Sequence, residues 1–204
     1  MSLAWQGSLF AGEVADPDTS FAQCARTELA GGAWVDHAPG WLAGSDTLFA
    51  ELVDTAPWTQ RQRRMYERLL DEPRLTAWWK DDEAGLPPVV PEIRSLLSDR
   101  YGVTFDSVGC NLYRDGRDSV AWHGDTVRKH QTTPIVAIVS LGEPRRFLLR
   151  PRGGGPSRRY ELGAGDLLVM GGTCQHTWEH SVPKVRSAGP RLSVTFRHSR
   201  SIEP

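Results

Sequence analysis

Residues 191–197 read RLSVTFR, and this stretch decides the fold class of the chain. Alternate side chains of an extended strand point to opposite faces. One face then carries Arg191, Ser193, Thr195 and Arg197. Two buried arginines are unfavourable unless they meet anions, because an unpaired guanidinium loses its hydration. The stretch therefore predicts a barrel strand that binds an anion such as a dicarboxylate on its inner face; a charged, exposed edge strand is the alternative.

Short β-branched and aromatic runs, separated by Gly, Pro and Asp, recur upstream of this stretch from about Thr104. We expect strands at 106–113, 119–123, 134–141, 145–150, 158–162, 166–170, 177–182 and 191–197. Many short strands at regular spacing are typical of an all-β sandwich or barrel.

The first hundred residues read instead as helices and loops. We expect a helix capped by 18–20 and ended by Gly31-Gly32, a second near 60–71, a third that begins at Pro91, and a loop at 72–90. The prediction is one mainly β domain, a double-stranded β-helix or jelly roll. In it, residues 1–103 form an N-terminal helical extension that buttresses the sheet, and 104–204 form the β core.

The composition is that of an ordinary globular protein, with 204 residues, 39% of them hydrophobic and 24% charged. A run of 18 apolar residues and a secretion signal are both absent from the sequence, so we expect a cytoplasmic protein without a membrane span. We also expect a monomer. The three cysteines have no paired spacing, which argues against a disulfide framework or a zinc knuckle.

The charge is unevenly distributed along the chain. Residues 1–108 hold 9 basic and 17 acidic side chains, whereas the remainder holds 15 basic and 8 acidic ones. Such a split can mark a surface that binds a polyanion, or it can reflect scattered solvated arginines. The cluster at 61–64, RQRR, likewise fits either a solvated helix face or a phosphate contact.

His123-Gly124-Asp125 places an imidazole and a carboxylate on the same face of a strand, so that both can reach one ion. His180 follows at a distance suited to the opposite wall of a barrel, and His176 is its rival as third ligand. Two histidines and one carboxylate form the facial triad of non-haem iron(II) oxygenases, which leaves positions open for oxygen and a chelating cosubstrate. The alternative is a surface histidine beside a solvated aspartate.

Asn111 and Tyr113 share a face of the first expected strand and can donate hydrogen bonds to carboxylate oxygens. With them, four motifs follow in one order: N-x-Y at 111–113, H-x-D at 123–125, a distal histidine at 180, and R-x5-R at 191–197. From about Pro73 to Arg197 the chain resembles the AlkB-type dioxygenases, most closely their nucleic-acid-repair branch.

The resemblance implies an iron(II) site at His123, Asp125 and His180, and O2 as co-reactant. It implies that 2-oxoglutarate is held by Asn111, Tyr113, Arg191, Ser193 and Arg197. It also implies oxidation of methyl groups on base nitrogens, as in 1-methyladenine and 3-methylcytosine, with decarboxylation of 2-oxoglutarate to succinate and release of formaldehyde. The expected partner is alkylated nucleic acid, either single-stranded DNA or RNA or a base flipped out of a duplex.

Trp78 and Trp79 lie where the family has its nucleotide-recognition lid, and we expect them to bind the base; packing of helices onto the barrel is the alternative. His123 can form the other face of the stack. The chain departs from the family at Val127, where repair members carry an acid, at Ser193, where Asn is common, and at 80–85, where an aromatic hairpin can follow. Other substrates, or a non-catalytic jelly-roll binding module, are therefore the alternatives.

Overall fold

Strand β15 (Arg191–Arg197) lies inside a seven-stranded antiparallel sheet. The computed structural model describes residues 13–65, 68–79, 85–125 and 131–198. In spatial order, the strands of this large sheet are β2 (Ala25–Glu28), β3 (Ala33–Ala38), β13 (Leu167–Gly172), β10 (Val136–Gly142), β15, β8 (Ser107–Tyr113) and β7 (Leu75–Trp79). A second, four-stranded antiparallel sheet has the order β12 (Arg158–Leu162), β11 (Arg145–Pro151), β14 (Trp178–Val182) and β9 (Val120–His123).

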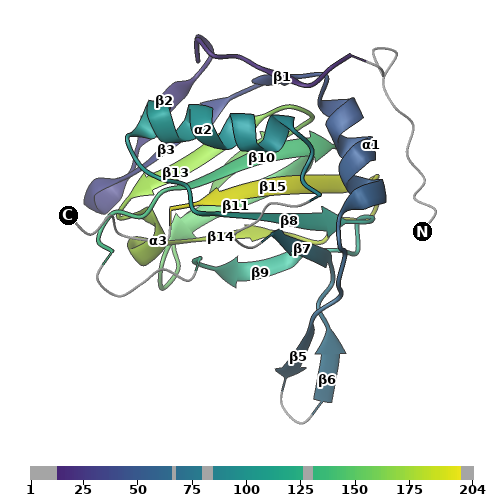
Figure 1. Cartoon of the computed structure of the whole chain (residues 1–204). Helices are drawn as coiled ribbons and strands as arrows, with labels where there is room; N and C mark the ends of the chain where they lie inside the picture. Colours follow the sequence, from purple (N-terminus) through teal and green to yellow (C-terminus); the bar gives the residue numbers. More distant parts are fainter. Residues whose placement is uncertain (1–12, 66–67, 80–84, 126–130, 199–204) are drawn as a thin grey trace.

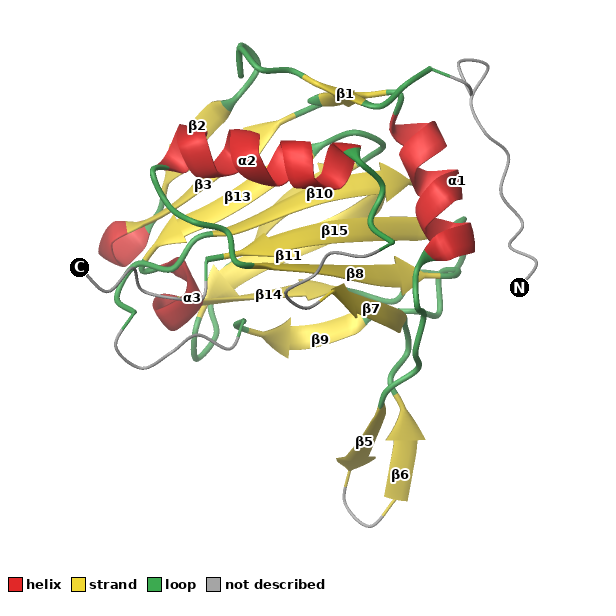
Figure 2. Ribbon diagram, in the orientation of Figure 1, coloured by secondary structure: helices red, strands yellow, loops and turns green. Residues whose placement is uncertain are grey.

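The two sheets face each other, and helices cover the outer face of the large one (Figures 1 and 2). Strand β10 illustrates the layering, because all seven of its residues are buried. Val136 and Ile138 pack in the core between the sheets, and Ala137 and Val139 pack in the core under the helices. A strand covered on both faces is apolar along its whole length, and this explains the run VAIVSLG.

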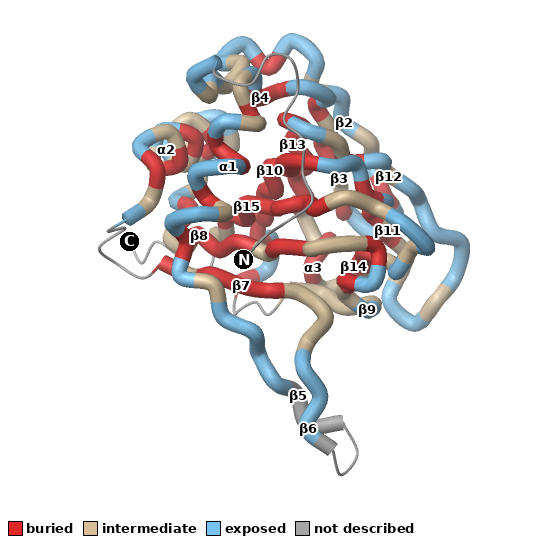
Figure 3. Tube along the Cα trace, turned by 90° about the vertical axis from the view of Figure 1, so that its right-hand side faces the viewer, coloured by how far each residue is buried: buried red, intermediate tan, exposed pale blue. Residues whose placement is uncertain are grey.

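Helices α1 (Ser45–Thr55) and α2 (Val89–Tyr101) form the outer layer. Each buries an apolar stripe, with Leu48 and Leu52 from α1 and Ile93 and Leu97 from α2. The smaller elements are η1 (Ala30–Gly32), α3 (Cys174–Thr177), the strand pair β1 (Asp16–Pro17) and β4 (Leu42–Ala43), and a hairpin of β5 (Gln62–Met65) and β6 (Arg68–Asp71). The hairpin projects from the body of the molecule (Figures 1 and 3).

The predicted fold class, a mainly β jelly roll with helices against the sheet, is confirmed, and so are all eight predicted strands. Their observed bounds lie within two residues of the expected ones. The helix expected at Pro91 is also present and begins two residues earlier, at Val89.

The prediction of helices and loops for the first hundred residues is largely wrong. The segment after 18–20 forms a turn and strand β2: the Asp18 carboxylate accepts hydrogen bonds from the backbone N–H groups of Ser20 and Ala22, as a helix cap would. Phe21, however, has a φ of 53°, and the chain turns there into the strand. A polar side chain that caps a turn gives the same sequence signal as one that caps a helix.

The helix expected near 60–71 is the hairpin β5–β6, and the loop expected at 72–90 contains strand β7. Pairing decides both cases, since Thr59 bridges to Thr76 and the backbone N–H of Glu72 donates to the carbonyl of Arg61. Such non-local pairing outweighs the helix propensity of Arg, Gln and Leu. Because β7 pairs with β8 and β3 pairs with β13, the expected boundary at residue 103 runs through one continuous sheet.

No helix in the described part of the chain is long and apolar enough to span a membrane. The monomeric state and the cytoplasmic location stay predictions.

Candidate metal and cosubstrate site

One pocket opens between the two sheets and has a volume of about 330 Å³. Strands β7, β8 and β15 of the large sheet form one wall, and β9, β11 and β14 of the small sheet form the other. Every residue singled out from the sequence for iron or for 2-oxoglutarate lines it, together with Trp78. The arginine-bearing face of 191–197 therefore points inward, and the exposed-edge alternative is wrong.

His123, Asp125 and His180 form a group whose ligand atoms all lie within 4.8 Å of one another. His123 and His180 are directly paired across β9 and β14, and their ring centroids are 4.3 Å apart. Asp125 follows the end of β9 by two residues. Two neighbouring strands of the small sheet and the segment that follows β9 thus supply the three groups expected of an iron(II) site.

Both histidines are prepared to bind a cation. His123 Nδ1 lies 2.9 Å from the carbonyl of Ala121, which can only accept, so Nδ1 carries the hydrogen and the Nε2 lone pair is free. Burial lowers the pKa of His180 to about 4, so its imidazole is neutral at pH 7. The ring of His180 also stacks on Phe147, with 5.2 Å between centroids, and this fixes its orientation.

Asp125 is held in place on two sides. Burial alone would raise the pKa of its carboxyl, but Arg197 and the two histidines outweigh that effect, so the pKa is lowered and the group is a carboxylate. Arg197 Nη2 lies 3.2 Å from Asp125 Oδ1. The backbone N–H of Asp125 donates to Oε1 of Gln175, a buried side chain from α3, at 3.1 Å.

The residues expected to hold 2-oxoglutarate come from cross-strand pairs of β8 and β15. Arg191 is opposite Tyr113, and Ser193 is opposite Asn111. Arg191 is only 1% exposed; its Nε donates to Ser140 Oγ at 3.0 Å, and its Nη2 has no hydrogen-bond partner among the described residues. Arg197 Nη1 is also buried without a described partner. Two buried guanidinium donors that face one pocket fit a bound dianion.

Trp78 and Trp79 point to opposite faces of β7, as neighbours on a strand must. Trp78 lines the pocket, whereas Trp79 packs in the core under the helices. The expectation that Trp79 contacts a base is thus contradicted, and the alternative, packing of helices onto the barrel, holds for that residue. Trp78 lies over Gly109, where a Cβ atom would be 2.6 Å from its ring, so only glycine leaves room for this position.

Two polar residues that line the pocket, Arg74 and Thr76, were missed as site residues. Arg74 and Thr76 alternate with Trp78, so period two would have placed all three on one face had 72–90 been recognised as a strand. Arg74 Nε donates to Asn111 Oδ1 at 3.2 Å and thereby leaves the amide nitrogen of Asn111 facing Ser193. Arg61, from the basic cluster, also lines the pocket.

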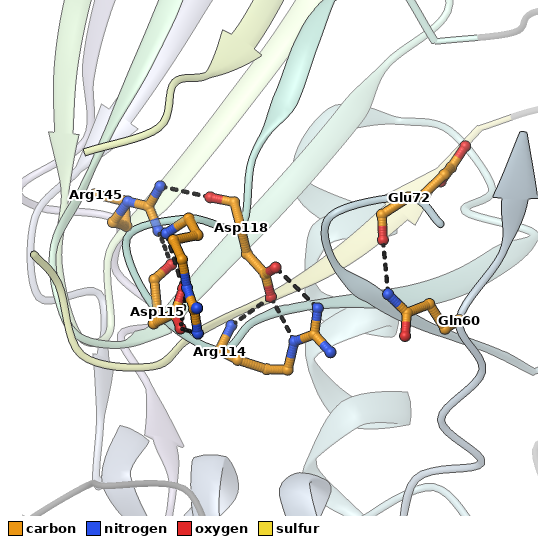
Figure 4. A network of polar contacts seen from close by, with 7 residues as sticks. Gln60, Glu72, Arg114, Asp115, Asp118 and Arg145 are labelled. Atoms are coloured by element: carbon orange, nitrogen blue, oxygen red, sulfur yellow. Dashed lines mark hydrogen bonds and ion pairs between the residues drawn. The ribbon is translucent and has the colours of Figure 1, made fainter. Parts of the chain in front are cut away.

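A polar network holds the turn that joins β8 to β9 (Figure 4). The buried guanidinium of Arg145 donates to the backbone carbonyls of Asp115, Asp118 and Pro183, at 2.8 to 3.0 Å. The side chain of Asp118 accepts from Arg114. These contacts fix the path between the strand that bears Asn111 and the strand that bears His123.

His176, the rival third ligand, lies in α3, and its Nε2 is 2.7 Å from the carbonyl of Gln131. It is not in the ligand group, so His180 is the better assignment. Val127 and residues 80–84 lie outside the described residues, so the two departures from the family pattern at these positions have no structural account.

A family model described as the 2OG-Fe(II) oxygenase superfamily matches residues 42–197. The chain belongs to this superfamily. Its members use iron(II), 2-oxoglutarate and O2. The described pocket fits these groups, because two imidazoles and a carboxylate converge beside two guanidinium groups, each of which has one buried nitrogen without a partner among the described residues. Bound iron and 2-oxoglutarate would thus be held by separate walls of one oxygenase pocket.

Similar proteins include members of the AlkB family, in agreement with the resemblance found in the sequence. "Alpha-ketoglutarate-dependent dioxygenase alkB homolog 3" of Bos taurus is 34% identical over an alignment of 182 residues, which covers 78% of this chain and 64% of that protein. "DNA oxidative demethylase ALKBH2" of Arabidopsis thaliana is 30% identical and covers 74% of this chain and 61% of that protein. The chain thus spans less than two thirds of the length of these relatives.

Solved oxygenase structures agree in fold. The structure of OsALKBH1 matches with a TM-score of 0.59 and 16% identity, and the match covers 85% of this chain and all of that one. A 2OG-Fe(II) oxygenase family protein from Burkholderia pseudomallei has a TM-score of 0.56 and 15% identity, with 82% and 86% of the two chains covered.

Proposed function

We propose that the protein is an iron(II)- and 2-oxoglutarate-dependent dioxygenase that removes alkyl groups from base nitrogens in DNA or RNA, the class that includes 1-methyladenine and 3-methylcytosine. One observation carries the proposal: the three groups suited to iron and the two arginines suited to a diacid line the same pocket. A non-catalytic binding module would have no physical reason to keep this costly set of buried charges together.

In this proposal His123, Asp125 and His180 bind the metal. Arg191 receives the distal carboxylate of 2-oxoglutarate deep in the pocket, and Arg197 lies beside Asp125, at the metal end. Asn111, Tyr113 and Ser193 complete the contacts from the same wall. When bound, iron(II) supplies oxygen activation, coupled to decarboxylation of 2-oxoglutarate to succinate, and the methyl carbon leaves as formaldehyde.

The substrate end of the pocket supports a planar substrate. Trp78 offers an indole face on the wall formed by the large sheet, and His123 lines the pocket from the small sheet. A base within a duplex cannot reach such a pocket, so the substrate is a base in a single strand or one flipped out of a duplex. Relatives named as DNA oxidative demethylases support a nucleic acid as the substrate.

The test is release of formaldehyde and succinate from single-stranded oligonucleotides that carry one methylated base, with DNA and RNA strands compared. Equal yields of both products that depend on iron, and that vanish in His123→Ala, support the proposal. Arg146→Gln serves as the control, because Arg146 is exposed on the small sheet and does not line the pocket. Succinate without formaldehyde from any strand would favour an oxygenase of another substrate class.

A further inference from the structure

Asp125 lies beyond the strand pairing that fixes the two histidines of the ligand group. Strands β9 and β14 pair at His123 and His180, and β9 ends at His123. Asp125 follows two residues later, so strand pairing does not fix the direction of its carboxylate. Its position must come from contacts outside the sheet. Arg197 contacts the carboxylate from the pocket, and Gln175 holds the backbone N–H from α3.

Gln175 is a buried amide whose one strong described contact is with Asp125. Its side chain is 2% exposed and is not among the residues that line the pocket. Oε1 accepts the backbone N–H of Asp125 at 3.1 Å, whereas the described neighbour of Nε2 is a weak acceptor, Met170 Sδ, at 3.8 Å. A half-satisfied amide is unfavourable in a core. The hydrogen bond to Asp125 is therefore the contact that accounts for a glutamine at this position.

Helix α3, which bears Gln175, is itself held by the residue that follows β11. The backbone N–H of Arg152 donates to the carbonyl of Thr177 at 2.8 Å, and its Nε donates to the carbonyl of His176 at 3.0 Å. Its Nη2 donates to the carbonyl of Gln175 at 3.3 Å. These three hydrogen bonds tie the short helix to the small sheet, so the amide of Gln175 is presented at a defined place.

Gly124, the middle residue of the H-x-D motif, allows α3 to approach this closely. A Cβ atom at Gly124 would lie 2.6 Å from Arg152 Nη2 and 3.0 Å from the carbonyl oxygen of Gln175. Both distances are shorter than a normal van der Waals contact, so a side chain there would force the arginine or the helix to shift. The glycine thus permits the contact between Asp125 and Gln175.

From these contacts we propose that Gln175 is a positioning residue for the metal centre: it fixes the backbone of Asp125, and thereby the direction from which the carboxylate reaches the ion. The inference rests on the metal site of the proposed function and extends that site to α3. Gln175 acts through Asp125, since it does not line the pocket itself. Groups that orient a metal's ligands contribute about 10- to 100-fold to metal affinity.

The test measures the dissociation constant for cobalt(II), titrated anaerobically into the full chain without 2-oxoglutarate. Gln175→Met keeps the length of the side chain but removes the amide oxygen, and should raise the constant about tenfold. Gln175→Glu keeps an acceptor oxygen at the same place and should bind cobalt(II) at least as tightly as the wild type. A packing role predicts the reverse order, because methionine is the better tolerated of the two in a core.

Gln131→Met is the matched control, because it removes another buried amide, whose Nε2 donates to the carbonyl of His198 at 2.8 Å. It should leave the dissociation constant within about twofold of the wild type. The visible absorption bands of bound cobalt(II) give a second reading, because their position and intensity depend on ligand geometry. These bands should differ from the wild type in Gln175→Met and match it in Gln131→Met.

A wild-type constant and spectrum in Gln175→Met, or equal losses of affinity in Gln175→Met and Gln175→Glu, would overturn the inference while the proposed function stands. A loss of the same size in Gln131→Met would also overturn it, because the cause would then be general loss of stability. Failure of the wild type to bind cobalt(II), or full binding by His123→Ala, would instead contradict the metal site of the proposed function.

Discussion

The two ends of the pocket are built differently. At the inner end, His180 and Arg191 are 5% and 1% exposed and lie on strands paired on both sides. At the outer end, Arg61 is exposed at the foot of the projecting hairpin, and Trp78 lies on β7, the edge strand of the large sheet (Figure 3). The groups suited to the reaction are thus fixed by the interior, whereas the groups suited to choosing a substrate lie at the margin, where sequence changes disturb the fold least.

The largest effect should come from the metal ligands. We expect Asp125→Ala to lower formaldehyde release by more than about 100-fold, since even residues outside a metal's ligand shell contribute 10- to 100-fold. Loss of metal binding, measured by anaerobic titration with iron(II), should accompany it. His176→Gln is the matched control and should keep both properties within about twofold, because His176 is not in the ligand group. Equal losses in the two variants would contradict the assignment.

The next effect sharpens the distinction between the two ends. Arg191→Met should raise the KM for 2-oxoglutarate about 100-fold, because the buried carboxylate would lose a charge-assisted bond. The KM for the oligonucleotide should change little. Calorimetric binding of 2-oxoglutarate in the presence of a redox-inert metal gives an independent reading, and unchanged affinity there would show that Arg191 does not hold the diacid.

Changes at the outer end should give the opposite pattern. Trp78→Ala should raise the KM for the oligonucleotide about tenfold, the usual loss for one stacked base, without raising the KM for 2-oxoglutarate. Trp79→Leu, in the adjacent core position, should lower the melting temperature while both KM values stay near those of the wild type. If the two variants behaved alike, the assignment of Trp78 to the pocket and of Trp79 to the core under the helices would be wrong.

A smaller effect of the same kind is expected from Gly109→Ala. The added methyl group would lie 2.6 Å from the Trp78 ring, so the indole must shift off the sheet. We expect a rise of about threefold in the oligonucleotide KM, within the range of one partly lost stacking contact. Gly163→Ala controls for the substitution itself, because Gly163 has no positive φ and its added methyl group would meet only ordinary contacts at 3.8 Å.

The smallest effect lies outside both ends and is a change in stability with pH. Burial would raise the pKa of Asp166, but His37 and the backbone N–H groups of Gly163 and Gly40 outweigh it, so the pKa is lowered. The unfolded state then binds the proton more readily, so the contribution of Asp166 to stability is present above its unfolded pKa and is lost as the pH falls through the folded one. Asp166→Asn should flatten the acid side of the melting-temperature profile below about pH 4. An unchanged profile would contradict this.

The strands from β8 to β15 could be predicted because their turns carry Gly, Pro and Asp and their faces alternate. The site followed from the same property, since one period-two pattern placed Arg191 and Arg197 on the inner face before any partner was known. A group that must be buried and charged leaves a clear signal in a sequence.

The outer end could not be predicted in this way. Residues 60–79 are rich in helix-forming side chains, and their strands depend on non-local pairing, with β8 and through the bridge from Thr59 to Thr76, which no local pattern predicts. The helix α1 was missed although Leu48, Phe49 and Leu52 have helical spacing, because Gly44 in the left-handed region replaces a side-chain cap at its start. The position of Trp78 depends on Gly109, thirty-one residues away in the sequence. The presence of a glycine does not indicate which side chain packs against it.

Adjacent tryptophans on an edge strand leave its alignment weakly defined. If β7 slipped by one residue along β8, an indole would still fill each face, so burial alone would scarcely distinguish the two alignments. The correct alignment of β7 must therefore be set by the bridge between Thr59 and Thr76 and by the space that Gly109 leaves for the Trp78 ring. A misaligned molecule would keep its iron centre and turn over 2-oxoglutarate without product, which makes uncoupled turnover a sensitive measure of how accurately this one strand has folded.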